Sequence, residues 1–365
     1  MRHLVNRDPG KRILGAAIDI GTSDIKGALL DIKSKKELAR ASVPNEQGAF
    51  GRDVITRLHF ATTNKKGPKE LKKRVISAIN KLLARLAKEA EVDKNCIKKV
   101  LAVGNSTMYH LIFMVRADSL ARAPFQPAAK KMRTKNARAM GINAAKNAEF
   151  KFLPNVAGFV GSDTLAVILS TKINKKKNHS LIVDIGTNGE IVLGSKNKIL
   201  VTSCACGPAF EGRYIRPGTK LIDLVAGLLD KGIIDKTGRM AVNKTPLTQA
   251  NVREAQVAKA ALAAGVEILL RKARIGVKDI DRLYITGNFG ANINVRNAKK
   301  IGLIPAGIRG NKITILKDGA LSGAKKVLLK PEKEREIKDI LAICEHVELH
   351  KDKDFQDIFA AFMSF

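Results

Sequence analysis

Two short stretches of this sequence combine residue types that are suited to holding a polyphosphate. The first is "AIDIGTSDIK", Ala17 to Lys26, and the second is "LIVDIGTNGE", Leu181 to Glu190. In both, an aspartate follows an apolar run and precedes a glycine and a threonine. Glycine lets the backbone approach an anion closely, turn N–H groups and hydroxyls donate hydrogen bonds to it, and carboxylates bind Mg²⁺ through its water shell. Either copy alone is typical of any tight hairpin, whereas the pair predicts a two-sided phosphate clamp.

The separation of the two copies indicates how the chain is organised. Asp19 and Asp184 lie nearly half of the 365-residue chain apart, far beyond the period of a solenoid repeat. A chain of this length is sufficient for two domains, each with its own core. We therefore expect two similar lobes, each carrying one copy of the turn.

The strands and helices that must position these turns follow from hydrophobic periodicity. Asn105 or Ser106 is expected to cap a helix that follows a strand over residues 100–103. His346 and His350 flank a strand in the alternating "HVELH" and are interpreted as structural. The other expected elements are strands within 15–40 and 180–203, helices over 70–92 and 248–273, a strand in 282–286 and a final strand and helix.

Bulk composition limits the classes of function. The chain carries 66 Lys and Arg against 34 Asp and Glu, a formal net charge of +32, but the lysines are spread along it. With no Trp, three Tyr and no nucleic-acid-binding motif, the excess is interpreted as a solvated surface without specific nucleic-acid recognition. The absence of a long apolar run and of a signal-peptide core predicts a cytoplasmic protein that does not bind a membrane.

Five stretches in a fixed order narrow the interpretation of the two turns. They are "DIGT" at Asp19, "NVAGFVGSDTLAVIL", "DIGT" at Asp184, "YITGNFGANI" and "DGALSGAKKVLL". This order resembles the superfamily of acetate and sugar kinases, Hsp70 and actin (ASKHA), in which it gives first phosphate turn, first connecting helix, second phosphate turn, adenosine turn and second connecting helix. The resemblance implies an α/β, actin-like ATPase fold of two RNase H-like lobes with ATP and Mg²⁺ in the cleft between them. We expect a tail over residues 1–14, a first lobe over 15–175 and a second lobe over 176–365.

The resemblance also implies roles for single residues. Asp19 and Asp184 are expected to bind the hydrated Mg²⁺, and Asp163, at the start of the first connecting helix, to orient the attacking water or to cap the helix. Lys26 stands where actin-like members have a lysine that contacts phosphate. The other expected cofactor-binding residues are Gly21, Thr22, Ser23, Gly186, Thr187, Asn188, Gly189, Gly207, Glu211, Gly287, Asn288 and Gly290.

Further segments point to a narrower family. They include "GRDVITRLHFA", "VGNSTMYHLIF", "ARAPFQP", "SCACGPAFEG", "LTQANVREAQVAKAA" and "HVELHKDKDFQDIFAAFMSF". Together they resemble the ATPase domain of the reductive activators of corrinoid proteins, the RACo and RamA type, from about Ala16 to Phe365. The resemblance implies that ATP is coupled to reduction of Co(II) to Co(I) in a corrinoid methyl-carrier protein, which is the expected partner.

The chain departs from that family in its cysteines. RACo-type proteins carry an N-terminal [2Fe–2S] domain and RamA-type proteins carry C-terminal iron–sulfur motifs. Cys96, Cys204, Cys206 and Cys344 include no CxxC pair and reproduce neither spacing. We therefore expect a stand-alone ATPase with no iron–sulfur cluster in this chain and a separate iron–sulfur protein as electron donor, with a homodimer as a further candidate assembly.

Three alternatives stay open. The first is a [4Fe–4S] activator ATPase of the 2-hydroxyacyl-CoA dehydratase or benzoyl-CoA reductase type, because "CACGPAFEG" resembles its ligand stretch with Cys204 at the ligand position. No second ligand cysteine lies upstream of it in a suitable place. The second is a small-molecule kinase of the same superfamily, for which no substrate pocket is evident. The third is a basic polyanion-binding scaffold, which would not need the five stretches.

Overall fold

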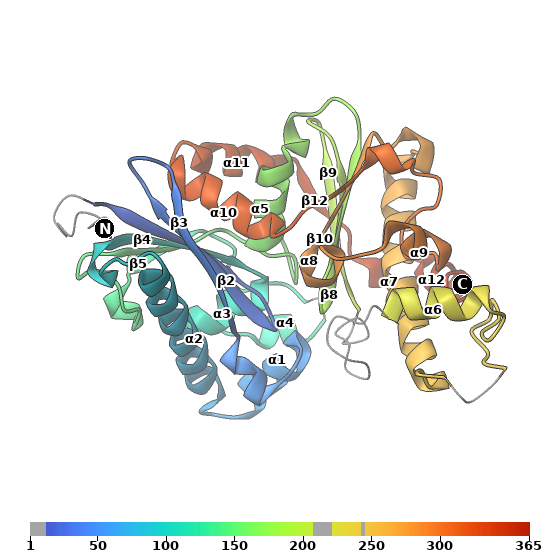
Figure 1. Cartoon of the computed structure of the whole chain (residues 1–365), viewed down its shortest axis with the longest axis horizontal. Coiled ribbons are helices and arrows are strands. Elements are labelled where there is room, and N and C mark those ends of the chain that lie inside the picture. The colour runs from blue at the N-terminus through green and yellow to red at the C-terminus, as the bar shows by residue number, and fades with distance from the viewer. Residues whose placement is uncertain (1–11, 124, 207–220, 242–244) are drawn as a thin grey trace, which may run out of the picture. The chain divides into compact units, whose positions relative to one another are not determined.

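Each of the two DIGT stretches forms the first hairpin of its own six-stranded sheet. The computed structural model describes residues 12–123, 125–206, 221–241 and 245–365. Their contacts divide the chain into a first unit, residues 1–170 with 320–342, and a second unit, residues 171–319 with 343–365 (Figure 1). The expected first and second lobes had instead been continuous, so the assignment of 320–342 to the first unit differs from the sequence-based division.

The first sheet has the strand order β3-β2-β1-β4-β6-β5. β1 pairs antiparallel with β2 and parallel with β4, and β4 pairs parallel with β6. The strands are β1 (Leu14–Ile20), β2 (Asp24–Asp31), β3 (Glu37–Pro44), β4 (Ile97–Gly104), β5 (Arg133–Asn136) and β6 (Glu149–Phe152). The helices of this unit are α1 (Val54–Thr63), α2 (Gly67–Glu89), α3 (Ser106–Phe113), α4 (Asp118–Ala121), α5 (Ser162–Thr171), α10 (Gly319–Leu329) and α11 (Lys333–Ile343).

The second sheet has the order β11-β10-β7-β8-β9-β12, in which five strands repeat the order β3-β2-β1-β4-β6 of the first sheet as β9-β8-β7-β10-β11 and the sixth strand, β12, lies at the other edge. Its first strand again pairs antiparallel with the second and parallel with the fourth. The strands are β7 (Ser180–Ile185), β8 (Asn188–Gly194), β9 (Ile199–Ala205), β10 (Arg282–Thr286), β11 (Ile313–Ile315) and β12 (Cys344–His346). The helices are α6 (Leu221–Asp230), α7 (Gln249–Ala273), α8 (Gly287–Gly290), α9 (Val295–Lys300) and α12 (Phe355–Ala361). The shared order of five strands is the RNase H-like arrangement, which confirms the α/β fold class and explains why the DIGT stretch occurs twice.

Short 3₁₀ helices complete the described chain. They are η1 (Glu46–Phe50), η2 (Lys94–Cys96), η3 (Arg138–Met140), η4 (Ile173–Lys175), η6 (Val277–Asp279), η7 (Gly310–Lys312) and η8 (Leu349–Lys351).

Glycines in the first hairpin admit helices on both faces of the first sheet. A Cβ on Gly27 would lie 2.8 Å from the Leu82 side chain of α2, and one on Gly15 would lie 3.1 Å from the Leu328 side chain of α10. Gly27 is paired with Ile18, three residues from Gly15, so the two glycines face opposite sides of the sheet. In Figure 1, α2 and α10 accordingly lie on opposite sides of these strands.

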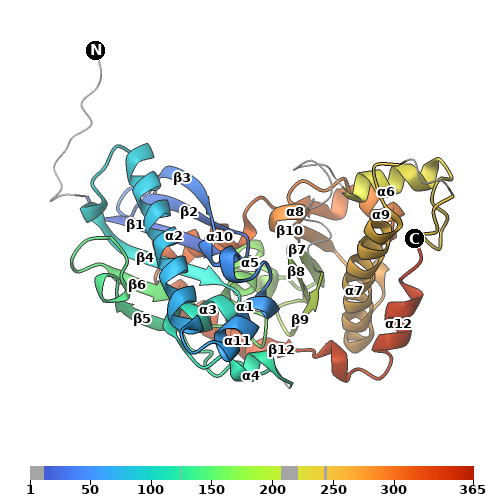
Figure 2. The same cartoon turned by 90° about the horizontal axis from the view of Figure 1, so that it is seen from below.

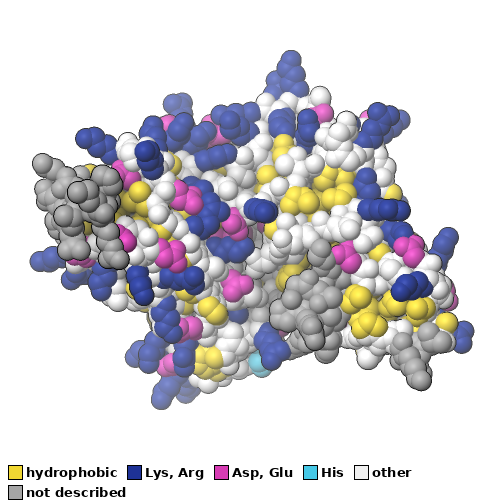
Figure 3. Space-filling view, in the orientation of Figure 1, with side chains coloured by type: hydrophobic (Ala, Val, Ile, Leu, Met, Phe, Trp, Pro, Cys, Tyr) yellow, Lys and Arg dark blue, Asp and Glu magenta, His cyan; other side chains and the backbone are white. Residues whose placement is uncertain are grey.

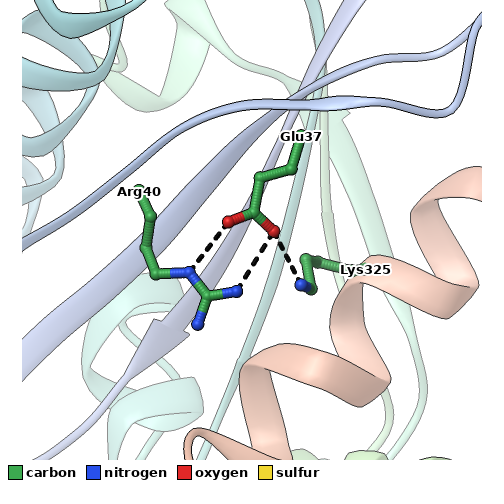
Figure 4. Close-up of polar contacts among 3 residues, drawn as sticks. All are labelled: Glu37, Arg40 and Lys325. Carbon is green, nitrogen blue, oxygen red and sulfur yellow. Dashed lines mark hydrogen bonds and ion pairs between the residues drawn. The ribbon is translucent and has the colours of Figure 1, made fainter.

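Ion pairs and close helix packing attach α10 to the first unit. Glu37 on β3 accepts hydrogen bonds from Arg40 Nε at 2.8 Å and from Lys325 Nζ of α10 at 2.7 Å, although Glu37 and Lys325 are 288 residues apart (Figure 4). Chiefly because of the Arg40 hydrogen bond, the pKa of Glu37 is lowered. A Cβ on Gly323 would lie 1.9 Å from the Ala166 carbonyl oxygen of α5, so α5 and α10 cross in backbone contact. This contact explains why residues 320–342 belong to the first unit.

In the second unit, α7 covers β8 and β9 and α12 packs beside it (Figure 2). The side chain of Thr248 caps α7 by accepting from the N–H of Asn251. Gly265 brings α7 close to the sheet, because a Cβ there would lie 2.4 Å from the Ile191 side chain. The helix is therefore anchored at its start by a cap and in its middle by a glycine.

On the face that Figure 3 shows, Lys and Arg side chains are spread out rather than gathered in one place. Asp and Glu side chains lie among them on the same face. This distribution fits the interpretation of the positive charge as a solvated surface. Within the described part of the chain, no helix combines the length and the apolar character needed to cross a bilayer.

Candidate phosphate-binding turns

The first turn connects β1 to β2, and its acidic and basic groups face each other. Asp19, the last residue but one of β1, is directly opposite Lys26 of β2 in the antiparallel register. Directly opposite residues have Cβ atoms about 4.5–5.5 Å apart. Both side chains are partly exposed. The hairpin thus brings together a carboxylate and an ammonium group that were proposed for Mg²⁺ and phosphate.

The tip of this turn requires glycine and buries a hydroxyl-bearing side chain. A Cβ on Gly21 would lie 2.7 Å from the carbonyl oxygen of Asp24. Thr22 follows and is 8% exposed, and its Oγ1 accepts a hydrogen bond of 3.3 Å from Asn105 Nδ2. Ser23 is partly exposed. The expected phosphate ligands of the first unit therefore lie in a tight turn with a defined backbone.

Asp163 lies at the edge of the first sheet where β1 also ends. Ser162 Oγ accepts the Gly104 N–H at 3.2 Å, and Gly104 is paired with Ile20, the residue after Asp19. The start of α5 is therefore held beside the end of β1. Asp163 is the second residue of α5, and its Oδ1 accepts the N–H of Thr164 at 2.8 Å. It consequently does not occupy the N-cap position, which had been one of its two expected roles.

The second turn connects β7 to β8 and has the same geometry as the first turn. Asp184 is the last residue but one of β7 and is opposite Glu190 of β8. The Gly186 N–H donates to the Asn188 carbonyl at 3.0 Å, which closes the turn around Thr187. Thr187 is 8% exposed, the same fraction as the equivalent threonine of the first turn. In place of the lysine of the first hairpin, this hairpin has a buried glutamate opposite its aspartate.

The expected adenosine turn lies directly beside Asp184. β10 runs parallel to β7 with Thr286 opposite Asp184, so the next residue, Gly287, passes over the end of β7. Gly287 has a φ of +92°, and a Cβ there would lie 2.3 Å from Asp184 Oδ1. Asn288 is exposed and Gly290 is buried against Ile285. The second unit therefore brings its phosphate turn and its glycine-rich turn together.

Two cysteines lie behind the second turn. Cys204 Sγ is 3.9 Å from Cys206 Sγ and 3.6 Å from the carbonyl oxygen of Gly189. The hydrogen bond with Cys204, and then burial, raise the pKa of the Cys206 thiol well above its usual value.

Among the described residues, no group of three or more His, Cys, Asp or Glu side chains is arranged to hold a metal ion. Gly207 and Glu211, also expected to bind the cofactor, lie outside the described residues.

Three residues that sequence reasoning did not assign to the site hold the first turn from behind. Asn45 Nδ2 donates to the Gly21 carbonyl at 2.8 Å, and Arg57 Nη2 donates to the Thr22 carbonyl at 2.7 Å. Asn105 was predicted only as a helix cap, a role that is confirmed, and it also bonds Thr22. One feature of the sequence indicated that Arg57 is buried. It occupies a position on the apolar face of α1, between Val54 and Leu58.

The geometry of both units can be compared with known families. Residues 14–176 match the model of the RACo middle region, and residues 178–220 with 242–365 match the model of the C-terminal ASKHA domain of RACo. The chain belongs to the RACo family. The family membership confirms the resemblance found in the sequence and agrees with the repeated RNase H-like sheet order.

Curated relatives of this RACo-family chain include proteins named for corrinoid activation. The corrinoid activation enzyme RamQ of Eubacterium limosum is 30% identical over 96% of this chain and 70% of its own length. A protein named [Co(II) methylated amine-specific corrinoid protein] reductase, of Methanosarcina barkeri, is 23% identical over 96% of this chain and 77% of its own length.

A solved structure gives the same fold. The reductive activator for corrinoid, iron–sulfur protein matches this RACo-family chain with a TM-score of 0.89 and 31% sequence identity. The match covers 97% of this chain but 66% of that protein, slightly under two thirds of its length. The similarity therefore includes both units of this chain and only part of the relative.

Proposed function

We propose that this chain is the ATP-binding and ATP-hydrolysing part of a reductive activator, which couples ATP to the reduction of Co(II) to Co(I) in a corrinoid methyl-carrier protein. The proposal rests on the duplicated hairpin, in which an aspartate ends the first strand of each sheet and a buried threonine follows in the turn. Relatives named for corrinoid activation and for Co(II) corrinoid-protein reduction support the choice of substrate.

ATP would be held by residues from both turns. In the first unit, the backbone of Gly21, the hydroxyls of Thr22 and Ser23 and the ammonium group of Lys26 are suited to phosphate oxygens. In the second unit, Thr187 and Asn188 offer a hydroxyl and an amide. Gly189 follows them, and because it has no Cβ it admits the sulfur atoms of Cys204 and Cys206 at close range. Both sets follow an aspartate at a strand end.

Magnesium fits the chemistry of these strand ends. Asp19 and Asp184 are partly exposed carboxylates, the kind of oxygen ligand that hydrated Mg²⁺ takes. When bound, the ion would neutralise negative charge on the phosphates. We assign the two aspartates to the water shell of the ion, and Asp163 to orienting the water that attacks the terminal phosphate.

The adenosine moiety is assigned to the glycine turn of the second unit. Gly287, Asn288 and Gly290 lie in α8, directly after strand β10, whose last residue is opposite Asp184, so a base held there would be close to the phosphates held by the second turn. A Cβ on residue 287 would clash with the Asp184 carboxylate, and because Gly287 has none, α8 can lie close to Asp184. The parallel pairing of β10 with β7 supports this assignment.

Electrons for cobalt would come from a separate iron–sulfur protein. The chain would recognise the corrinoid protein and change conformation with its nucleotide state, so that ATP shifts the partner toward the reducible form. The net charge of +32 would steer an acidic partner, an effect that fades with salt over a Debye length of about 10 Å at 0.1 M.

Calorimetry tests the nucleotide part of the proposal. A non-hydrolysable ATP analogue should bind the chain in the presence of Mg²⁺, and binding should be lost when Asp19→Ala and Asp184→Ala are combined. If the analogue does not bind, or binds the double variant as tightly as the unaltered chain, the phosphate-clamp assignment is wrong.

A cobalt assay tests the substrate. The chain is mixed with a Co(II) corrinoid protein of its source organism, ATP and a low-potential electron donor, and absorbance follows the cobalt. Co(I) should form only when the chain, ATP and the donor are all present. Absence of association with every corrinoid protein tested, at low salt and with either ATP or ADP, would reject this function while leaving the nucleotide site intact.

A further inference from the structure

Three consecutive carbonyl groups of the first turn each accept a hydrogen bond from residues outside the turn. The Gly21 carbonyl accepts from Asn45 Nδ2 at 2.8 Å, the Thr22 carbonyl from Arg57 Nη2 at 2.7 Å, and the Ser23 carbonyl from the Asn45 N–H at 2.8 Å. In a planar trans peptide the N–H points opposite to the C=O. Fixing these carbonyls therefore also fixes the directions of the N–H groups of the same peptides, which are the groups that would donate to a bound phosphate.

Arg57 is the centre of this arrangement because its guanidinium group donates to at least three oxygen atoms at once. Its side chain, 1% exposed, donates from Nε to the Gly51 carbonyl at 2.8 Å, from Nη1 to Gln47 Oε1 at 3.4 Å and from Nη2 to the Thr22 carbonyl. The planar guanidinium group has five N–H donors in a fixed geometry, whereas a lysine ammonium group is a single point of contact. Arginine can thus fix the position of the turn relative to α1.

The same network continues to α2. Gln47 is fully buried, and its Nε2 donates to the Leu71 carbonyl of α2 at 3.0 Å. Its backbone N–H donates to Asn45 Oδ1 at 3.1 Å, which orients the asparagine whose Nδ2 bonds the turn. The turn is therefore connected through buried polar groups to the longest helix of its unit.

Asn105 orients the hydroxyl of the turn. Its Oδ1 accepts the Met108 N–H at 3.0 Å as the cap of α3, and its Nδ2 donates to Thr22 Oγ1 at 3.3 Å. Because Oγ1 accepts in this bond, the hydroxyl hydrogen of Thr22 is left to donate elsewhere. A phosphate oxygen is the acceptor expected on the far side of the turn.

We propose that Arg57 is a positioning residue for the first phosphate turn, and that Asn105 positions the Thr22 hydroxyl. This inference rests on the proposed function, since it assumes that the turn binds nucleotide phosphate. Arg57 also places a buried positive charge behind the turn, which raises the electrostatic potential at the phosphate position. Neither residue itself touches the nucleotide.

The decisive comparison is Arg57→Lys with Arg85→Lys. Both variants keep the charge, but Arg85 is an exposed residue of α2 that pairs with Glu89 at 2.8 Å and donates to the Ser42 carbonyl at 3.2 Å rather than to Gly21, Thr22 or Ser23 of the turn. The affinity for a Mg²⁺-bound, non-hydrolysable ATP analogue should fall about tenfold in Arg57→Lys, the loss expected for one charge-assisted hydrogen bond, and stay unchanged in Arg85→Lys. The affinity for adenosine, which has no phosphate, should be equal in both.

A second variant covers the case in which Arg57→Lys does not fold. Asn105→Asp keeps the oxygen that caps α3 but replaces the amide donor to Thr22 by a carboxylate. It should fold, as judged by its thermal midpoint, and bind the ATP analogue at least about tenfold more weakly, with adenosine binding unchanged.

The outcomes separate this inference from the proposed function. Failure of the unaltered chain to bind the analogue overturns both. Equal analogue affinity in Arg57→Lys and Arg85→Lys, or in Asn105→Asp and the unaltered chain, overturns the inference alone. Parallel losses of adenosine and analogue binding would also overturn it, because they would indicate general damage to the fold rather than an effect on the phosphate turn.

Discussion

Gly287 and Asp184 are in contact within the second unit, although 103 residues separate them. Gly287 has a φ of +92°, and a Cβ on it would lie 2.3 Å from Asp184 Oδ1 and 2.4 Å from the carbonyl oxygen of Ile185. The contact follows from the parallel pairing of β10 with β7, which places Thr286 opposite Asp184. A residue with a side chain at position 287 would displace either the carboxylate or the glycine turn.

Gly287→Ala should therefore weaken ATP binding by about tenfold or more, since small misplacements at a binding site have large effects. It should also lower the free energy of unfolding by about 1–3 kcal/mol because of backbone strain. Gly232→Ala is the matched control, because Gly232 has a φ of +67° but no atom within 4 Å of its Cβ position. Calorimetry compares the ATP affinities of the two variants, and urea unfolding compares their free energies of unfolding. Equal ATP affinities in both variants would contradict the prediction.

Asp163→Asn should reduce the rate of ATP hydrolysis by about 100-fold while leaving nucleotide affinity nearly unchanged. A group that orients the attacking water acts mainly in the transition state, which is why rate and affinity should separate. Asp357→Asn, in the first turn of α12, controls for the loss of a negative charge at a helix start. Steady-state kinetics and calorimetry provide the measurements. Equal losses of rate and affinity would reduce Asp163 to a structural residue of α5.

Cys204→Ser should leave ATP binding nearly intact, and the chain purified without oxygen should contain no iron. Cys204 Sγ contacts Cys206 Sγ at 3.9 Å and the Gly189 carbonyl at 3.6 Å, and a serine hydroxyl can replace the second contact. Iron analysis and visible absorbance measure whether the purified chain contains an iron–sulfur cluster. A brown protein with stoichiometric iron that is lost in Cys204→Ser would instead favour the [4Fe–4S] activator ATPases.

His110 should make the first unit less stable in acid. Burial lowers the pKa of this fully buried histidine below its ordinary value of 6.5, while its Nδ1–H donates to the Ser106 carbonyl at 2.7 Å. As pH falls below 6.5 the unfolded chain binds a proton that the folded chain does not, so the free energy of unfolding falls, by at most about 1.4 kcal/mol per pH unit. Urea unfolding at pH 7.5 and 5.5 should show a smaller difference for His110→Asn than for the control His59→Asn, whose site is exposed.

Lys259 should affect the stability of the second unit at alkaline pH. It is 1% exposed, its Nζ donates to the Ser364 carbonyl, and burial lowers its pKa from 10.5 to about 8. Between pH 8 and 10.5 the unfolded chain holds a proton that the folded chain has lost, so this residue's contribution to stability rises with pH. Lys259→Met should remove that rise, whereas Lys231→Met, at an exposed site of the same unit, should retain it. Identical pH profiles for the two variants would show that Lys259 stays protonated.

Local chemistry was sufficient to predict the two hairpins and the two longest helices, α2 and α7. An apolar run followed by Asp, Gly and Thr specifies a strand and a tight turn within ten residues, and the structure has both hairpins where they were expected. The cap at Asn105 and the helix α7 were likewise set by neighbouring residues, because capping bonds and helical periodicity involve residues three or four positions apart.

What only the tertiary structure decided involves partners that are distant in sequence. The hydrogen bond from Arg57 to the Thr22 carbonyl joins residues 35 apart, and the ion pair of Lys325 with Glu37 joins residues 288 apart. In the sequence an arginine or a lysine indicates a solvated surface, because a charged side chain is buried only where the fold supplies enough acceptors. The sequence by itself determined the duplicated turns. The hydrogen bond from α1 to the first turn decided that Arg57 would support one of them, and the crossing of α5 with α10 decided that residues 320–342 would belong to the first unit, because both contacts join segments that are far apart in the sequence.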